Sequence, residues 1–170
     1  MRQIITIVSA LLLALGCGAL SQTPQEREAE AEQIRQRLDS RAFVVDINYM
    51  IPLRGPASAL TSPYSITVDG DVIYSHLPYT GVAYKVPYGG GKVLNFKDEI
   101  DEYADSGFQN GSRTIVLSVD NDEDILVYTI TISDSGKADV HVRCRNRENI
   151  SFRGELDPDE EVPSAKKKGE

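Results

Sequence analysis

The sequence predicts a mainly β fold: a curved antiparallel meander of about eight or nine strands, sandwich or barrel-like, with one N-terminal helix. Three observations predict it. From about residue 41 onward, apolar residues recur at every second position, which is the spacing of half-buried strands. The connections between these stretches are short and rich in Gly, Asp and Asn, which leaves no room for crossover helices. A helical pattern occurs only before residue 40.

Residues 1–21 are predicted to be an export signal. Arg2 precedes an uncharged apolar run from Ile4 to Leu15 that ends in small residues. This run of about a dozen residues is shorter than the roughly 20 that span a bilayer. The mature protein is therefore expected to work outside the cytoplasm.

Two cleavage sites compete within this signal. Cys17 ends a stretch that resembles a bacterial lipobox, in which cleavage precedes a lipid-modified cysteine. Lipidation of Cys17 would attach the protein to a membrane without spanning it. Ala19-Leu20-Ser21 instead has the small-x-small pattern of ordinary secretory cleavage and would release a protein that begins at Gln22.

Residues 22–40 are predicted to form a helical spacer. Thr23 can cap the helix, Pro24 suits its first position, and Glu26 can close a capping box. The apolar stripe is narrow, so the helix is expected to be mostly solvated and to pack on the domain only near its end. The residues of this stripe are Ala31, Ile34 and Leu38.

The β domain is assigned to residues 41–156. A first strand alternates from Phe43 to Tyr49, and a hairpin turn at Asp69-Gly70-Asp71 joins strands at 64–68 and 72–76. Further strands are expected at 82–86, 92–96, 115–119, 126–132, 138–144 and 150–152. Between them, 98–103 is expected to form a short helical turn and 105–111 a polar loop. Residues 157–170 are expected to be a disordered tail.

Composition excludes several classes of function. The chain carries 26 acidic and 18 basic residues, for a net charge of -8, and such a surface repels phosphate backbones. Nucleic acid is therefore not an expected partner. Whichever cleavage site is used, Cys144 is the only free thiol of the mature protein, so no disulfide framework is expected. Cys144 alternates with Val140 and Val142, which favours a buried, inert thiol.

No motif identifies a catalytic residue, a metal site or a cofactor, and none of these is predicted. The acidic run 120–124 resembles the start of an EF-hand, but Ile125 and Thr131 occupy the positions that need Gly and Glu. A solvated acidic hairpin turn is favoured instead. Gly89-Gly90-Gly91 fits a strand turn better than a phosphate loop. His141 shares a polar face with Asp139 and is expected to be exposed and non-catalytic.

The distribution of tyrosine is the one local anomaly. Six of the eight tyrosines lie between residues 49 and 88, several beside Pro and Gly. Tyrosine in loops suits the recognition of a peptide or sugar. The alternative is that these are ordinary strand residues that fill the core and its rims. The six are Tyr49, Tyr64, Tyr74, Tyr79, Tyr84 and Tyr88.

Five segments, in order, resemble the family catalogued as domain of unknown function 4251. They are residues 49–55 (YMIPLRG), 77–84 (LPYTGVAY), 87–91 (PYGGG), 94–96 (LNF) and 150–154 (ISFRG). The resemblance extends over roughly residues 25 to 156. It implies a single exported domain of a Gram-negative, gut-type bacterium, often made with a lipoprotein-like signal, and it implies no catalytic residue.

The expected function is a periplasm-facing envelope protein, in the periplasm or as an outer-membrane lipoprotein, that binds a peptide, glycan or protein partner without catalysis. The candidate ligand-binding residues are Tyr79, Tyr88, Arg54 and Asn95. Two alternatives stay open. One is an envelope hydrolase that uses carboxylates such as Asp46 or Asp139, for which two carboxyl groups must share a cleft. The other is a structural or inhibitory protein without a pocket.

Overall fold

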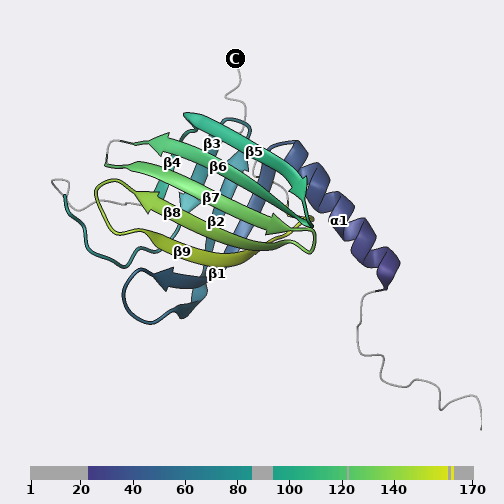
Figure 1. The fold of residues 1–170 in the computed structure, drawn as a ribbon, viewed down its shortest axis with the longest axis horizontal. Helices are drawn as coiled ribbons and strands as arrows, with labels where there is room; N and C mark the ends of the chain where they lie inside the picture. The colour runs from purple at the N-terminus through teal and green to yellow at the C-terminus, as the bar shows by residue number, and fades with distance from the viewer. Residues whose placement is uncertain (1–22, 86–93, 122, 161, 163–170) are drawn as a thin grey trace, which may run out of the picture.

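The computed structural model of the chain describes residues 23–85, 94–121, 123–160 and 162, and within them it contains one helix and a nine-stranded antiparallel sheet. The sheet curls into a half-barrel: β5 to β9 form one layer, and β1 to β4 pass behind it (Figure 1). The predicted mainly β fold is confirmed. The elements are α1 (Pro24–Asp39), β1 (Ala42–Pro52), β2 (Ser58–Asp69), β3 (Val72–His76), β4 (Asn95–Glu99), β5 (Glu102–Gln109), β6 (Ser112–Asp120), β7 (Ile125–Ser133), β8 (Lys137–Cys144) and β9 (Ile150–Leu156).

The order of strands in the sheet is β4-β3-β2-β1-β9-β8-β7-β6-β5. The first and last strands therefore pair in the middle of the sheet, and β4 and β5 form its edges. Only Ile100 and Asp101 separate the two edge strands in sequence. The Ile100 amide donates to the Asp71 carbonyl at 2.8 Å, and the Asp101 amide donates to the Ser118 carbonyl at 3.0 Å. This corner is thus bonded to both layers.

The edge strands contradict two expectations from the sequence. The helical turn expected at 98–103 is the end of β4 and the start of β5, and most of the polar loop expected at 105–111 is β5 itself. A bulge between Asp105 and Phe108 interrupts the pairing of β5. An edge strand faces water along one side and tolerates polar residues on both faces, so its apolar alternation is weak.

The strand expected at 82–86 is also shorter than predicted. Its described part forms a single bridge, from Ala83 to Arg147. Val86 and the glycines at 89–91 lie outside the described residues, as does the signal segment 1–21.

The core lies between the two layers and is built from alternate residues of the strands. Burial of Cys144 agrees with the prediction, and it raises the pKa of the thiol to about 11, as expected of an unreactive cysteine. One polar chain crosses the apolar interior. The Tyr128 hydroxyl donates to Ser75 Oγ at 3.1 Å, and Ser75 Oγ donates to the Leu94 carbonyl at 2.8 Å. This chain ties β7 in one layer to β3 in the other.

A close backbone approach at Gly154 permits the central pairing of β1 and β9. A Cβ atom at this position would lie 1.9 Å from the carbonyl oxygen of Asp46, so only glycine fits. The register of β1 shifts between Ile47 and Tyr49, directly after this contact. Gly154 therefore allows the backbones of β9 and β1 to pair closely where the sheet bends from one layer into the other.

Helix α1 begins and packs as the sequence predicts. Thr23 is its N-cap, and the capping box with Glu26 is formed. Ile34 and Leu38 are fully buried, whereas the first turns project away from the sheet (Figure 1). The helix is therefore attached by its C-terminal half.

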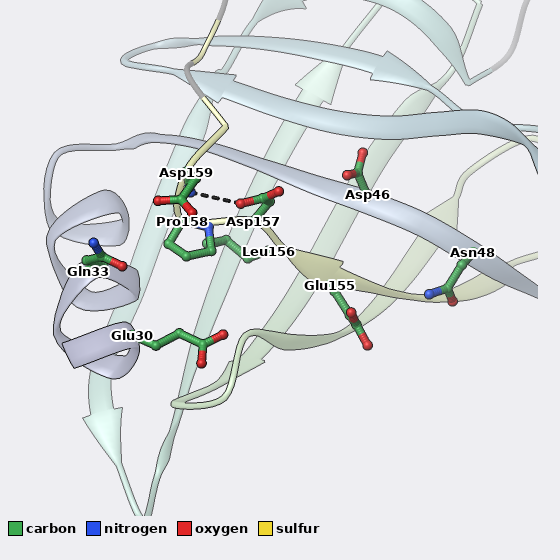
Figure 2. A pocket seen from close by; sticks show the side chains of 9 residues that line it. All are labelled: Glu30, Gln33, Asp46, Asn48, Glu155, Leu156, Asp157, Pro158 and Asp159. Carbon is green, nitrogen blue, oxygen red and sulfur yellow. Dashed lines mark hydrogen bonds between the residues drawn. The ribbon is translucent and has the colours of Figure 1, made fainter. Parts of the chain in front are cut away.

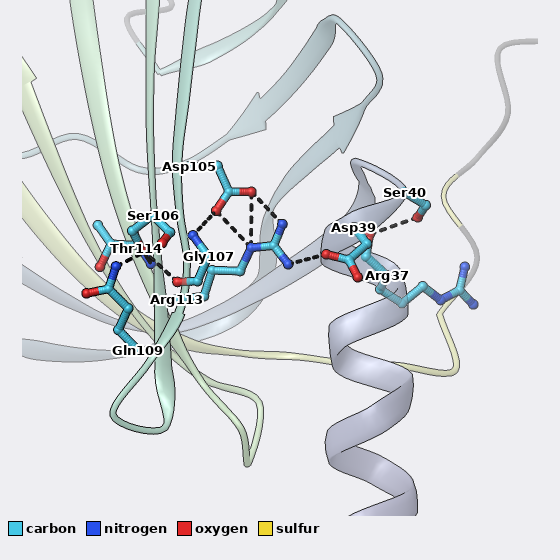
Figure 3. Close-up of polar contacts among 9 residues, drawn as sticks. All are labelled: Arg37, Asp39, Ser40, Asp105, Ser106, Gly107, Gln109, Arg113 and Thr114. Atoms are coloured by element: carbon cyan, nitrogen blue, oxygen red, sulfur yellow. Dashed lines mark hydrogen bonds and ion pairs between the residues drawn. The ribbon is translucent and has the colours of Figure 1, made fainter.

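Arg113 on β6 holds that half of the helix in place (Figure 3). Its Nε donates to Asp105 Oδ1 at 2.9 Å, a second guanidinium nitrogen pairs with Asp105 Oδ2, and the third pairs with Asp39 at the end of α1. The Arg113 side chain is 9% exposed. Its hydrogen bonds hold the pKa of Asp105 below the ordinary value. We call Arg113, Asp105 and Asp39 the helix clip.

Candidate functional site

Several loops meet at the end of the domain that lies opposite α1 (Figure 1). They are the connection between β1 and β2, the segment that follows β3, the turn between β6 and β7, and the connection between β8 and β9. We call residues 53–57, 77–85, 123–124 and 145–149 together the loop end. Two buried carboxylates, Glu148 and Asp124, organise it.

Glu148 joins three of these segments. One carboxylate oxygen accepts from Arg54 Nε at 3.0 Å, and the other accepts from the Val82 amide at 3.1 Å. The backbone of Glu148 bonds to the same region, because its amide donates to the Val82 carbonyl at 3.0 Å and its carbonyl accepts from the Tyr79 hydroxyl at 3.0 Å. The Glu148 side chain is only 3% exposed. It therefore acts as an internal tie between the loops.

Asp124 does the same for the β6–β7 turn and the segment after β8. Its Oδ1 accepts from the backbone amides of Ile125, Arg145 and Asn146 at 2.9 to 3.0 Å. Its Oδ2 accepts from Arg147 Nε at 2.9 Å, in an ion pair whose side chains are 0% and 3% exposed. One further nitrogen of the Arg147 guanidinium is buried and makes no hydrogen bond within the described part of the chain.

The burial of Asp124 corrects the interpretation of the 120–124 run as a solvated acidic turn. The hairpin between β6 and β7 is present, but its last carboxylate points inward. The sequence carries one signal that fits this result: Asp124 directly precedes the apolar strand 125–132. Its partner Arg147 is distant in sequence, so the pair could not be read from local spacing.

Two of the predicted ligand-binding residues meet at Glu148. Arg54 remains 78% exposed while it pairs with that carboxylate, whereas Tyr79 is half-buried and turns its hydroxyl inward. Burial is the largest cause that raises the pKa of Tyr79, to about 12, and the Arg147 charge opposes it. Tyr79 is therefore a structural anchor of the loop end in this conformation. A role in ligand binding stays a prediction for both residues.

Asn95 supports the loop end from one step further away. Its side-chain amide donates to the Leu77 carbonyl at 3.1 Å, at the start of segment 77–85. Tyr88 and Cys17, the other two predicted site residues, lie outside the described residues. Of the remaining tyrosines in the cluster, Tyr49, Tyr64 and Tyr74 are half-buried strand residues, which supports the alternative reading for those three.

The outer surface of the loop end carries exposed apolar side chains. Among the residues that the structure describes, four large hydrophobic side chains stand out as exposed, and three of them belong to this end or adjoin it. Leu53 is 62% exposed, Val82 51% and Tyr84 66%, whereas Val116 lies apart on β6. The Tyr84 amide donates to the Asn146 carbonyl at 2.8 Å, so the backbone beneath this side chain is fixed.

A second candidate is an acidic pocket beside α1, with a volume of about 530 Å³ (Figure 2). Partial burial, followed by the charge of Asp157, raises the pKa of Asp46 above its ordinary value. Asp139, the other carboxylate named for hydrolysis, is not among the lining residues and forms an exposed ion pair with Arg153 at 3.2 Å. The pocket is lined by Glu30, Gln33, Asp46, Asn48, Glu155, Leu156, Asp157, Pro158 and Asp159.

His141 is exposed, as expected, and it has a partner that sequence spacing did not suggest. Its Nδ1 lies 2.9 Å from the hydroxyl of Ser151, which is its cross-strand neighbour on β9. Asp139 would have to orient the imidazole in a catalytic triad, but it pairs with Arg153 instead. A hydrogen-bonded pair on an exposed sheet face is the simplest interpretation.

The described residues contain neither a candidate membrane span nor a candidate metal site. No helix there is long and apolar enough to cross a membrane. No group of three or more His, Cys, Asp or Glu side chains there comes together as a set of metal ligands.

Comparison with known proteins finds one family and a shared fold. A family model described as "Domain of unknown function (DUF4251)" matches residues 25–156. The chain is also similar to the crystal structure of a DUF4251 family protein from Bacteroides eggerthii, with a TM-score of 0.55 and 16% identity, over 75% of this chain and 87% of that chain. No curated protein matches the chain.

Proposed function

The chain belongs to the DUF4251 family, a domain of unknown function, and from that premise we propose that it is a non-catalytic binding module of the cell envelope. The loop end is its recognition surface. The observation that carries this proposal is the exposure of Leu53, Val82 and Tyr84 over a framework that Glu148 and Asp124 hold rigid from within. Exposed apolar groups on a fixed backbone are typical of interaction sites, because little ordering is needed on binding.

The proposed location is the periplasmic side of a Gram-negative envelope. It is supported by the export signal predicted for residues 1–21 and by the origin of the similar structure in Bacteroides eggerthii. An anchor at Cys17 would precede α1, and the loop end lies at the opposite end of the domain from that helix (Figure 1). A protein tethered in this way would present the loop end away from the membrane.

Site-specific crosslinking tests the recognition surface. A photoreactive amino acid at position 84 is expected to form adducts with a partner in intact envelopes, whereas the same amino acid at Val116 is not. Both side chains are exposed, so Val116 is a matched control. With the purified partner, Tyr84→Ser is expected to weaken binding by about tenfold or more, because tyrosine is often a dominant contact. Equal crosslinking at both positions, or unchanged affinity, would count against this surface.

The mass of the mature protein tests the anchor. Expression in a Gram-negative host is expected to yield an acylated species that begins at Cys17, and Cys17→Ser is expected to release the protein into the soluble fraction. A wild-type mass that corresponds to an unmodified start at Gln22 would instead establish cleavage after Ala19-Leu20-Ser21 and remove the anchor. The binding proposal does not depend on which start is found.

Hydrolysis is a second candidate function, and one observation favours it. Asp46, with its raised pKa, shares the acidic pocket with Asp157 and two further carboxylates of the same segment. Acid–base hydrolysis of a glycoside requires two carboxyl groups in one cleft, and the one that acts as the general acid needs a raised pKa. If this function is real, Asp46→Asn abolishes release of sugars from isolated envelope glycans, and Asp139→Asn does not. The absence of any release by the wild type would discard it.

A further inference from the structure

We propose that the loop end takes an extended, acidic polypeptide segment, which pairs with the free backbone edge at Ala83, between Val82 and Tyr84. This inference rests on the proposed binding function and names the chemical class of its partner. Three observations carry it: an unpaired backbone edge, an apolar face beside that edge, and a local excess of positive charge.

The backbone edge follows from the hydrogen bonds around Ala83. The Val82 carbonyl accepts from the Glu148 amide, and the Tyr84 amide donates to the Asn146 carbonyl. In this antiparallel pattern, Ala83 and Arg147 are a non-hydrogen-bonded pair. The N–H and C=O of Ala83 therefore point away from residues 145–148, and they have no hydrogen-bond partner within the described part of the chain. Such an edge is what an added peptide strand requires.

The apolar face lies along the same segment. Side chains two residues apart share one face of an extended chain, so Val82 and Tyr84 lie on the same side. Both are more than half exposed, as is Leu53. Alternate side chains of an added strand would contact Val82 and Tyr84, which suits aliphatic or aromatic residues at every second position.

The charge beside this edge is opposite to that of the whole chain. The chain carries a net charge of -8, but the exposed charged residues next to the edge are cations: Arg54, Lys85 and Arg145. The two nearest carboxylates, Glu148 and Asp124, are buried and each is paired with an arginine. The β6–β7 hairpin, with Glu123, forms the acidic border of the surface. Because Arg54 already pairs with Glu148, carboxylates on the partner would chiefly complement Lys85 and Arg145.

The pairing requirement favours a polypeptide over other anions. The N–H and C=O of Ala83 need a donor and an acceptor at strand spacing, which a peptide backbone supplies. A phosphate diester offers acceptors alone, and a lipid headgroup does not hold a donor and an acceptor at strand spacing. The partner is therefore expected to contain a segment in which Asp or Glu alternates with apolar residues.

A defined peptide tests this inference. The probe is a capped octapeptide in which Asp and Glu alternate with Val and Tyr, added to the ¹⁵N-labelled mature protein. Its binding is expected to shift the amide signals of residues 82–85, to protect the Ala83 amide from exchange, and to weaken about tenfold when salt is raised from about 50 to 300 mM. The same peptide with Lys in place of the acidic residues is not expected to bind.

Variants of the protein separate the contribution of backbone hydrogen bonds to the affinity from that of surface charges. Ala83→Pro removes the edge N–H and is expected to reduce affinity about tenfold or more. Lys85→Gln together with Arg145→Gln is expected to reduce both the affinity and its salt dependence, and Arg153→Gln, on β9, to change neither. If Ala83→Pro fails to fold, protection of the Ala83 amide in the wild type decides the question.

Several results would overturn the inference. They are equal binding of the lysine peptide, no binding of the acidic peptide, an unprotected Ala83 amide in the complex, or binding of anionic phosphatidylglycerol vesicles with variant effects like those expected for the peptide. A partner that crosslinks at position 84 through a segment that is neither acidic nor extended would also overturn it. That last result would leave the proposed binding function intact, whereas the absence of any crosslink at position 84 would remove both.

Discussion

Unfolding of the Asp124→Ala variant is expected to require about 3–5 kcal/mol less free energy than unfolding of the wild type, because it leaves the buried Arg147 guanidinium without its counter-ion. Three backbone amides lose an acceptor at the same time, those of Ile125, Arg145 and Asn146. Urea titration would measure the loss, and the Tm is expected to fall by roughly 10 °C or more.

Two controls separate this effect from a general sensitivity of the hairpin. Asp120→Asn changes an exposed carboxylate of the same hairpin and is expected to alter stability by less than about 0.5 kcal/mol. Arg147→Met in the Asp124→Ala background removes the buried charge that has lost its counter-ion, and is expected to recover part of the lost free energy of unfolding. A cost of less than about 1 kcal/mol for Asp124→Ala alone would show that water solvates the pair more than the structure suggests.

The second large effect is expected at the helix clip. Arg113→Met is expected to lower the free energy of unfolding by about 2–4 kcal/mol, because it leaves Asp105 partly buried without its guanidinium partner. Asp39 is 70% exposed, so its share of this loss is small. Since α1 is attached by its C-terminal half, hydrogen exchange is also expected to be faster in the variant than in the wild type. This increase is expected to be larger for the amides of α1 than for those of β7.

The stabilisation by the Arg113–Asp105 pair is expected to depend on pH in a defined direction. The pKa of Asp105 is lowered in the folded protein, first by its hydrogen bonds with Arg113, from an ordinary value of 3.8. The stabilisation is therefore fully present above that value and is lost as the pH falls through the folded-state pKa. The difference between wild type and Arg113→Met is expected to be constant from about pH 7 to 5 and to shrink below 3.8.

An exposed ion pair supplies the control for the clip. Arg153→Met breaks the pair with Asp139, whose side chains are 64% and 75% exposed, and is expected to cost less than about 1 kcal/mol. Similar costs for Arg113→Met and Arg153→Met would contradict the assignment of the clip as a partly buried interaction.

Much of the fold could be predicted, because local pattern and tertiary role agree in its central elements. The capping box at Thr23 and the alternation in β6, β7 and β8 each predicted the element that the structure contains. The prediction of the edge strands was wrong for a physical reason. In β5, both faces carry polar residues, and one backbone edge faces water, so no period of two marks the strand.

The candidate site was harder to predict than the fold. Arg54 and Tyr79 were named from sequence, but their meeting at Glu148 depends on three loops that fold together. Glu148 and Asp124 were missed, because polar residues in a run of charges look solvated until distant segments cover them. The exposure of Tyr84 likewise depends on the bond of its amide to Asn146.

The pairing of β1 with β9 has a consequence for how the chain folds. These strands are the first and the last of the described sheet in sequence, yet they lie at its centre. The sheet consists of two meanders, β1 to β4 and β5 to β9, and in each of them strands that are neighbours in sequence pair through local contacts. Joining the two meanders through β1 and β9 instead requires closure of a loop almost as long as the domain. The slow step of folding is therefore expected to be this closure, which cannot occur until the last strand has been synthesised.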